Sequence, residues 1–166
     1  GGGGGGGLSS EREFELRSKL ISFIRMVSCQ KHTSLGKGEV VFREGDKANL
    51  FYILASGELA VSANAATSAD SSATESANAV SVRVGTVMAG EGFGESTLLR
   101  GQPAHTKTVT CASERCEVVS ILGEDFLRLV EKSRVVRESF ERLSLARNVS
   151  NEETIRNRSI NQSTDR

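Results

Sequence analysis

One acidic residue, Glu95, follows three closely spaced glycines at positions 90, 92 and 94 and precedes a short apolar run. Glycines before a helix let the backbone approach a ligand closely, and the first N–H groups of that helix are free to bind an anion. An acid in such a place either complements the helix dipole or accepts a hydrogen bond from the ligand. The stretch 92–109 therefore predicts a turn, one or two helical turns, a second turn and a strand, built around a candidate anion site.

Residues for other kinds of chemistry are sparse. The histidines His32 and His105 and the cysteines Cys29, Cys111 and Cys116 do not have the spacing of metal ligands. Three cysteines leave one unpaired under any scheme, so we interpret them as reduced and structural. No nucleophile with a base, no metal cluster and no convergent pair of carboxylates is recognisable in the sequence. We therefore expect neither enzymatic activity nor a bound metal or cofactor.

Charge and hydropathy argue against two broad classes of function. The chain has 21 basic and 21 acidic residues, and its net charge is zero. A nucleic-acid backbone demands a basic excess, so we expect no nucleic-acid partner. No apolar run is long enough to span a bilayer, and the first residues lack the features of a signal peptide. The 166 residues predict one cytoplasmic domain of ordinary size, with no insertion into a membrane.

Three stretches of the sequence carry a family resemblance. Phe93-Gly94-Glu95 resembles the phosphate-binding cassette of cyclic nucleotide-binding domains, which regulate kinases, gated channels, exchange factors and the catabolite activator protein. Residues 38–46, GEVVFREGD, are similar to the first hairpin of that family, and residues 51–61, FYILASGELAV, are similar to its next strand pair. A lone Phe-Gly-Glu is a weak signal, whereas three motifs in the family's order are specific. The resemblance covers roughly residues 31–145.

The resemblance implies that the ligand is a cyclic nucleotide, cAMP or cGMP. In this family the acid of the cassette accepts a hydrogen bond from the ribose 2′-hydroxyl, which would be the role of Glu95. The backbone at Gly94 and Ser96 would approach the phosphate, and Thr106 would lie beside it. The ligand-binding residues that we predict are Phe93, Gly94, Glu95, Ser96, His105 and Thr106.

The sequence departs from the family at the arginine that neutralises the phosphate. That arginine begins the strand after the turn, and no arginine occupies the position here. When the family's pattern is aligned on the strand, His105 occupies the position of the arginine. When it is aligned on the proline of the turn, Ala104 occupies that position. We prefer His105, because its ten-residue distance from Glu95 matches the longer turn of the catabolite activator branch. Lys107 and Arg100 are alternative carriers of the missing charge.

The missing arginine leaves two functions open. The first is a regulatory domain that senses a cyclic nucleotide and passes the signal to an effector domain or subunit by movement of its C-terminal helices. The second is a degenerate domain that no longer binds nucleotide and acts as an interaction or autoinhibitory module. Arginine makes a permanent forked contact with a phosphate, whereas neutral histidine offers a single donor. A titration with cAMP and cGMP would show whether the domain still binds nucleotide, and would therefore separate the two functions.

The elements that must position these residues follow from hydrophobic spacing. Short strands punctuated by glycine are predicted at 40–43, 50–55, 58–63, 80–88, 106–111 and 117–122. Such strands favour a mainly β fold, an eight-stranded antiparallel roll of the jelly-roll kind. Helical stripes before residue 28 and between Phe126 and Leu143 predict an N-terminal helix and a C-terminal helix pair on its outside.

Composition divides the chain into segments. We predict a flexible glycine segment at 1–8, an N-terminal helix at 9–30, a cyclic nucleotide-binding domain at 31–147 and a polar tail at 148–166. Within the domain the roll occupies 31–123 and the C-terminal helices occupy 124–147. Residues 63–79 are nearly all Ala, Ser, Thr and Asn, which predicts a mobile loop between two strands. The tail lacks hydrophobic periodicity, which predicts disorder or a linker.

Overall fold

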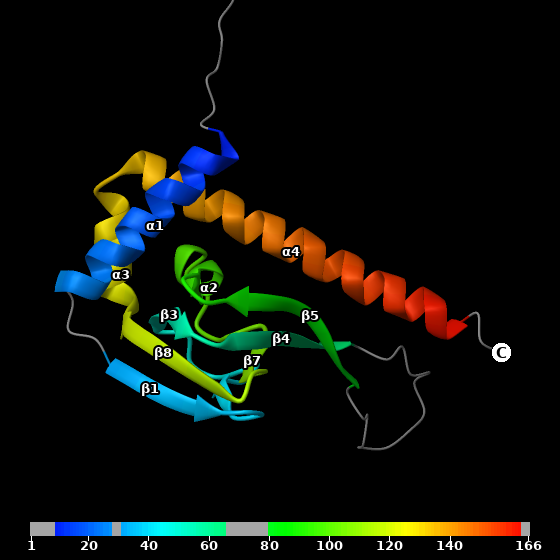
Figure 1. Cartoon of the computed structure of the whole chain (residues 1–166). Coiled ribbons are helices and arrows are strands. Elements are labelled where there is room, and N and C mark those ends of the chain that lie inside the picture. Colours follow the sequence, from blue (N-terminus) through cyan, green and yellow to red (C-terminus); the bar gives the residue numbers. More distant parts are fainter. Residues whose placement is uncertain (1–8, 28–30, 66–79, 164–166) are drawn as a thin grey trace, which may run out of the picture.

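Two four-stranded antiparallel sheets form a roll in the computed structural model, which describes residues 9–27, 31–65 and 80–163 (Figure 1). One sheet has the order β1 (Lys31–Gly36), β8 (Arg115–Leu122), β3 (Leu50–Ser56) and β6 (Gly92–Phe93). The other has the order β2 (Val40–Phe42), β7 (Thr108–Cys111), β4 (Glu58–Ala65) and β5 (Val80–Met88). The predicted eight-stranded antiparallel roll is confirmed. The glycine segment at 1–8 and residues 66–79 of the predicted loop lie outside the described residues.

Strand β3 contributes to two apolar cores, one inside the roll and one outside it. Its residues 51–54 are all buried, because alternate side chains point to opposite faces of the sheet and both faces are covered. Tyr52 and Leu54 pack inside the roll with Phe42, Phe93 and others. Phe51 and its neighbour Ile53 pack outside the roll against helices. The sequence of β3 is therefore a continuous apolar run rather than an alternating one.

The outer core fixes the C-terminal helices, α3 (Gly123–Glu131) and α4 (Arg134–Ser163), against the first sheet. The ring of Phe126 in α3 stacks on Phe51 with centroids 4.0 Å apart, and the edge of Phe140 in α4 meets Phe126 at 5.3 Å. Because all three rings are almost fully buried, they join both helices to β3. This arrangement confirms the predicted C-terminal helix pair.

The N-terminal helix α1 (Ser10–Val27) lies beside the first turns of α4 (Figure 1). Arg17 Nη1 donates a hydrogen bond to Ser139 Oγ at 2.6 Å, and Arg142 forms an ion pair with Glu13 at 2.5 Å. Ser139 is completely buried, so the first of these contacts is shielded from water. The helix is therefore joined to α4 by polar contacts as well as by the apolar contacts of Ile21.

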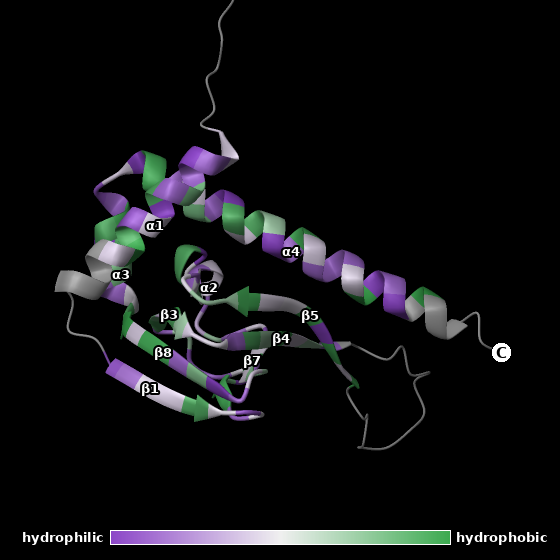
Figure 2. Ribbon diagram, in the orientation of Figure 1, coloured by the Kyte–Doolittle hydropathy of each residue, from purple (hydrophilic) through white to green (hydrophobic). Residues whose placement is uncertain are grey.

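Two sequence predictions are wrong at their boundaries. Residues 148–163, predicted as a disordered tail, continue α4, which runs along the roll beside β5 (Figure 1). Figure 2 shows that this half of α4 is mostly hydrophilic with isolated hydrophobic positions, so the apolar periodicity is weak. The helix is nevertheless held by packing, since Ile155 contacts the cluster of Ala63, Val82 and Val84. That cluster also explains why residues 63–65, predicted as loop, belong to β4.

Candidate functional site

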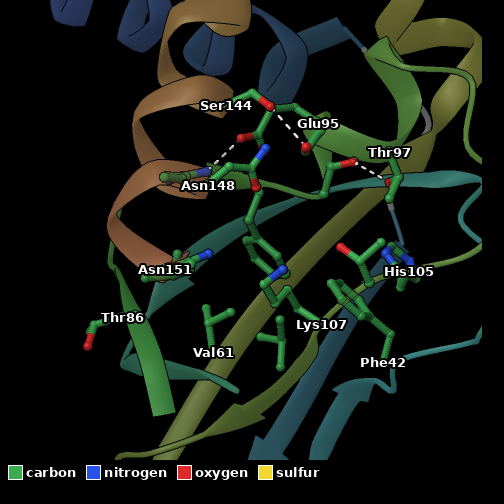
Figure 3. Close-up of a pocket in the computed structure, with 18 residues that line it drawn as sticks. Phe42, Val61, Thr86, Glu95, Thr97, His105, Lys107, Ser144, Asn148 and Asn151 are labelled. Atoms are coloured by element: carbon green, nitrogen blue, oxygen red, sulfur yellow. Dashed lines mark hydrogen bonds and ion pairs between the residues drawn. The ribbon is translucent and has the colours of Figure 1, made fainter. Parts of the chain in front are cut away.

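A pocket lies between the second sheet, the short helix α2 (Glu95–Leu99) and α4 (Figure 3). All six predicted ligand-binding residues line it: Phe93, Gly94, Glu95, Ser96, His105 and Thr106. The structure therefore brings together residues from both ends of the stretch 92–109, which the sequence singled out.

The turn that presents Glu95 depends on glycine. Gly94 has φ 83°, in the left-handed region, where the chain passes from β6 into α2. A Cβ at this position would lie 3.1 Å from Tyr52 Cδ2 and 3.3 Å from Leu50 O. Glycine thus brings the backbone close to β3 and puts Glu95 at the first position of α2, where its side chain is only 2% exposed.

The carboxylate of Glu95 is held by α4. Arg147 Nη1 donates to Glu95 Oε1 at 2.9 Å and also to the carbonyl oxygen of Gly92 at 3.1 Å. One turn earlier, Ser144 Oγ donates to Ser96 Oγ at 2.9 Å (Figure 3). The cassette and the last helix are therefore linked directly. The sequence analysis missed Arg147, because the predicted domain boundary fell at that residue.

Two asparagines of α4 complete the wall. Asn148 and Asn151 line the pocket one turn beyond Ser144 and Arg147, opposite Gly85 and Thr86 of β5. The amide nitrogen Nδ2 of Asn148 is buried and has no hydrogen-bond partner within the described part of the chain. A buried amide without a hydrogen-bond partner is unfavourable, and an acceptor atom of a ligand would satisfy it. The sequence signal that could have identified these asparagines is their spacing, because polar residues three or four positions apart lie on one face of a helix.

His105 lies in the wall as a neutral ring. It is 4% exposed and stacks on Phe42, with ring centroids 3.6 Å apart and planes 9° from parallel. Nε2 is buried without a hydrogen-bond partner among the described residues. Burial lowers the pKa of His105 below its ordinary value, and the nearby charge of Asp46 opposes this effect only in part. The histidine therefore does not reproduce the permanent charge of the family's arginine.

Of the two alternative cations, only Lys107 lines the pocket. It is half-buried, and Figure 3 shows its side chain reaching toward the centre of the pocket. Within residues 9–27, 31–65 and 80–163, no carboxylate forms an ion pair with Lys107. Arg100, in contrast, is exposed and is not part of the wall. The positive charge available to a ligand in this part of the wall is that of Lys107.

The buried histidine makes a testable contribution to the pH dependence of stability. Its folded pKa lies below the unfolded value of about 6.5, so below that pH the unfolded chain binds a proton more readily than the folded chain. We expect the free energy of unfolding to fall as the pH falls from about 6.5 toward the folded pKa, by at most about 1.4 kcal/mol per pH unit. Urea unfolding at about pH 7.5 and about pH 5.5 measures this slope.

The matched variants are His105→Gln and His32→Gln, which together account for both histidines of the chain. His105→Gln should remove most of the slope. His32 is exposed on β1, so His32→Gln should retain the slope of the parent. Equal slopes in His105→Gln and the parent would contradict this account of the buried ring.

The described residues offer neither a metal-binding cluster nor a membrane-spanning helix. No group of three or more His, Cys, Asp and Glu side chains among them is arranged to hold a metal ion. None of the helices in the described ranges has the length and apolar character needed to cross a membrane.

The fold has counterparts in solved structures. The catabolite activator protein of Thermus thermophilus matches with a TM-score of 0.58 and 20% identity, over 86% of this chain and 56% of that chain. The c-di-GMP-responsive regulator CLP of Xanthomonas campestris matches with a TM-score of 0.60 and 19% identity, over 83% and 61%. The regulatory domain of Toxoplasma gondii PKA, solved with cAMP, matches with a TM-score of 0.56 and 19% identity, over 81% and 49%.

These similarities establish a common fold, and the chain spans between about half and three fifths of the length of the solved chains named above. No curated protein matches the sequence. The family model of the cyclic nucleotide-binding domain matches residues 32–133, which is more than half of the 166 residues. The chain therefore belongs to the cyclic nucleotide-binding domain family.

Proposed function

We propose that the pocket binds a cyclic nucleotide, cAMP or cGMP, and that the chain is a regulatory rather than a catalytic module. The observation that carries this proposal is the buried carboxylate of Glu95, which lies in the wall of an open pocket together with every other predicted ligand-binding residue. Besides the hydrogen bond from Arg147, this carboxylate can accept one from a hydroxyl, and the ribose 2′-hydroxyl of a cyclic nucleotide supplies one.

The pocket offers a partner for each part of the ligand. The backbone at Gly94 and Ser96, the hydroxyl of Thr106 and the ammonium group of Lys107 are the groups available to the cyclic phosphate. Lysine contributes a point charge, which suits a single phosphate oxygen, whereas arginine contributes a forked pair of donors. In this proposal Lys107 replaces the family's arginine, while neutral His105 contributes packing and one donor.

The purine base fits the part of the pocket between β4, β5 and α4. Val61 and Val87 supply apolar wall, and Asn148 and Asn151 supply amide groups on the helix side. Each amide has both donors and an acceptor, and purine edges carry both kinds of group. The unpartnered Nδ2 of Asn148 supports a ligand acceptor at this position.

The signal would pass through α4. A ribose hydroxyl that binds Glu95 must share the carboxylate with Arg147, which donates a hydrogen bond to Glu95 Oε1. Ser144 and Ser96 form a second link between α4 and the cassette, and both line the pocket. Differential contacts of this kind let a ligand shift the position of a helix. We propose that α4 conveys ligand binding to an effector domain or subunit.

The direct test is a titration with cAMP and cGMP, compared with that of Glu95→Gln. An amide oxygen is a weaker acceptor than a carboxylate, so we expect about tenfold weaker binding for this variant. Glu131→Gln, an exposed change on α3, is the matched control and should bind as the parent does. Equal affinity of Glu95→Gln and the parent would refute the role of Glu95.

One observation favours the second function, a domain that no longer binds nucleotide. His105 occupies the position of the family's arginine, yet it is buried, uncharged and stacked on Phe42. If neither cAMP nor cGMP binds to the parent, the degenerate module is the better account. The variant His105→Arg then tests whether the rest of the pocket remains competent to bind.

A further inference from the structure

Two buried thiols lie under the turn that joins β7 to β8. Cys111 is the last residue of β7, and Cys116 is the second residue of β8. The two residues are 2% and 0% exposed, and both are free cysteines. Buried cysteines usually behave as small apolar residues, and whether they react depends on what their sulfur atoms contact.

Ser113 connects the two sulfur atoms. Cys111 Sγ donates a hydrogen bond to the carbonyl oxygen of Ser113 at 3.2 Å, and the hydroxyl oxygen of the same serine lies 3.4 Å from Cys116 Sγ. The two thiols also interact with each other, since each one changes the pKa of the other. The sulfur atoms are therefore neighbours on the two sides of one tight turn, as the partners of a disulfide must be.

The two cysteines belong to different sheets of the roll. Cys111 is opposite Leu59 of β4 in the second sheet, whereas Cys116 is opposite Leu35 of β1 in the first. The turn between them, residues 112–115, is partly or fully exposed. A surface turn opens locally more readily than the strands of a core, and such an opening is the route by which a small oxidant reaches the thiols.

The two thiols differ in acidity. Burial and the neighbouring thiol of Cys116 raise the pKa of Cys111 to about 11, so Cys111 stays protonated at neutral pH. Burial also opposes the thiolate of Cys116, but hydrogen bonds from Cys111 and Ser113 outweigh this effect and hold its pKa below the ordinary value. The thiolate is the form that attacks an oxidant. Cys116 is therefore the first thiol to react, and Cys111 lies beside it as the resolving thiol.

We propose that Cys111 and Cys116 form a reversible redox site, in which a peroxide converts the two thiols into a disulfide. The thiolate of Cys116 attacks one oxygen of the peroxide, the O–O bond breaks, and the products are a sulfenic acid and hydroxide. The thiol of Cys111 then attacks the sulfenic sulfur atom, the S–S bond forms, and water leaves. Two electrons pass from the sulfur atoms to the peroxide, and a dithiol reductant returns them.

The surroundings of Cys116 hold its thiol near Cys111. Cys116 Sγ donates a hydrogen bond to the carbonyl oxygen of Glu58 at 3.1 Å. Gly57 lies close to the same sulfur, and a Cβ at this position would be only 2.8 Å from Cys116 Sγ. A disulfide bond is about 2.05 Å long, so it forms by rotation of the two side chains toward each other. None of these residues lines the nucleotide pocket, so the redox site is independent of the proposed function.

The first test uses the chain with Cys29→Ser, because the third cysteine would otherwise compete for the oxidant. The reduced protein is treated with hydrogen peroxide, its remaining thiols are alkylated, and it is digested with trypsin. Trypsin cleaves at Arg115, between the two cysteines, which therefore fall in the separate peptides 108–115 and 116–128. We expect a monomeric protein in which these peptides are linked, and dithiothreitol should separate them. Two alkylated thiols after treatment, or a disulfide between two chains, would overturn the proposal.

The second test determines which thiol attacks the peroxide. Cys111→Ser in the same background removes the resolving thiol, so the sulfenic acid of Cys116 should accumulate and react with dimedone. Cys116→Ser is the matched control. It retains the Cys111 thiol, whose pKa is raised mainly by burial, and it should trap at least about tenfold less dimedone in the same time. Equal trapping by the two variants, with circular dichroism spectra like that of the parent, would contradict the assignment of Cys116 as the attacking thiol.

Discussion

Replacement of Arg147 by alanine should lower the free energy of unfolding by about 3 kcal/mol, because it leaves a buried carboxylate without its partner. Glu95 is only 2% exposed, and Arg147 is the residue that holds it, at 2.9 Å. The expected loss lies at the low end of the range for buried pairs, since the adjacent pocket admits water. Alanine is a strong helix former, so α4 itself should persist. Urea unfolding monitored by circular dichroism measures the change.

A double variant separates the charge from the packing. When Glu95→Gln accompanies Arg147→Ala, no unpaired buried carboxylate remains at this contact, and most of the lost stability should return. The control is Arg137→Ala, which removes an exposed ion pair with Glu141, one helical turn further along α4, at 3.1 Å. It should change the free energy of unfolding by less than about 0.5 kcal/mol. A loss below about 1 kcal/mol for Arg147→Ala would mean that pocket water solvates Glu95 adequately.

The sequence was sufficient to predict the roll wherever strands have strong periodicity. β5 alternates buried and exposed residues, and the phase shifts once, where β5 has an extra residue opposite Val61 and Ser62 of its partner β4. Strands β1 and β6 were not predicted individually. The residues of β1 are mostly exposed, and β6 has two residues, so neither contains an alternating pattern. Their partners β8 and β3 supply the hydrogen bonds that define them.

The candidate site, like the roll, was predicted only where the sequence carries a local signal. The turn chemistry around Gly94 and the acid after it are local signals, and local signals can be recognised in a sequence. Arg147 contacts Glu95 across 52 positions of chain, and nothing near either residue identifies the other. The extent of α4 was underestimated because its inward positions include asparagine and arginine, which apolar periodicity does not detect. Long-range polar contacts therefore require the folded chain.

Replacement of Lys107 by alanine should weaken cyclic-nucleotide binding about thirtyfold, which corresponds to about 2 kcal/mol. The phosphate of the ligand is an anion, and Lys107 is the pocket-lining cation without an ion pair among the described residues. Because Lys107 is half-buried, its interaction with the phosphate is screened less than that of a surface residue. Affinity of the parent should fall as the salt concentration rises, and this dependence should be smaller in Lys107→Ala.

Two further variants make the prediction about Lys107 specific. Arg100→Ala removes an exposed cation from the same turn region and should leave affinity unchanged, whereas Lys107→Arg keeps the charge and should retain most of the binding.

The pH profile distinguishes Lys107 from His105. If Lys107 rather than a histidine binds the phosphate, affinity should be flat between about pH 6 and pH 8, because histidine is the ordinary side chain whose charge changes in that range. If His105 bound the phosphate, the ligand would favour its charged form, and affinity would rise as the pH falls. Such a rise, together with unchanged binding in Lys107→Ala, would transfer the role to His105.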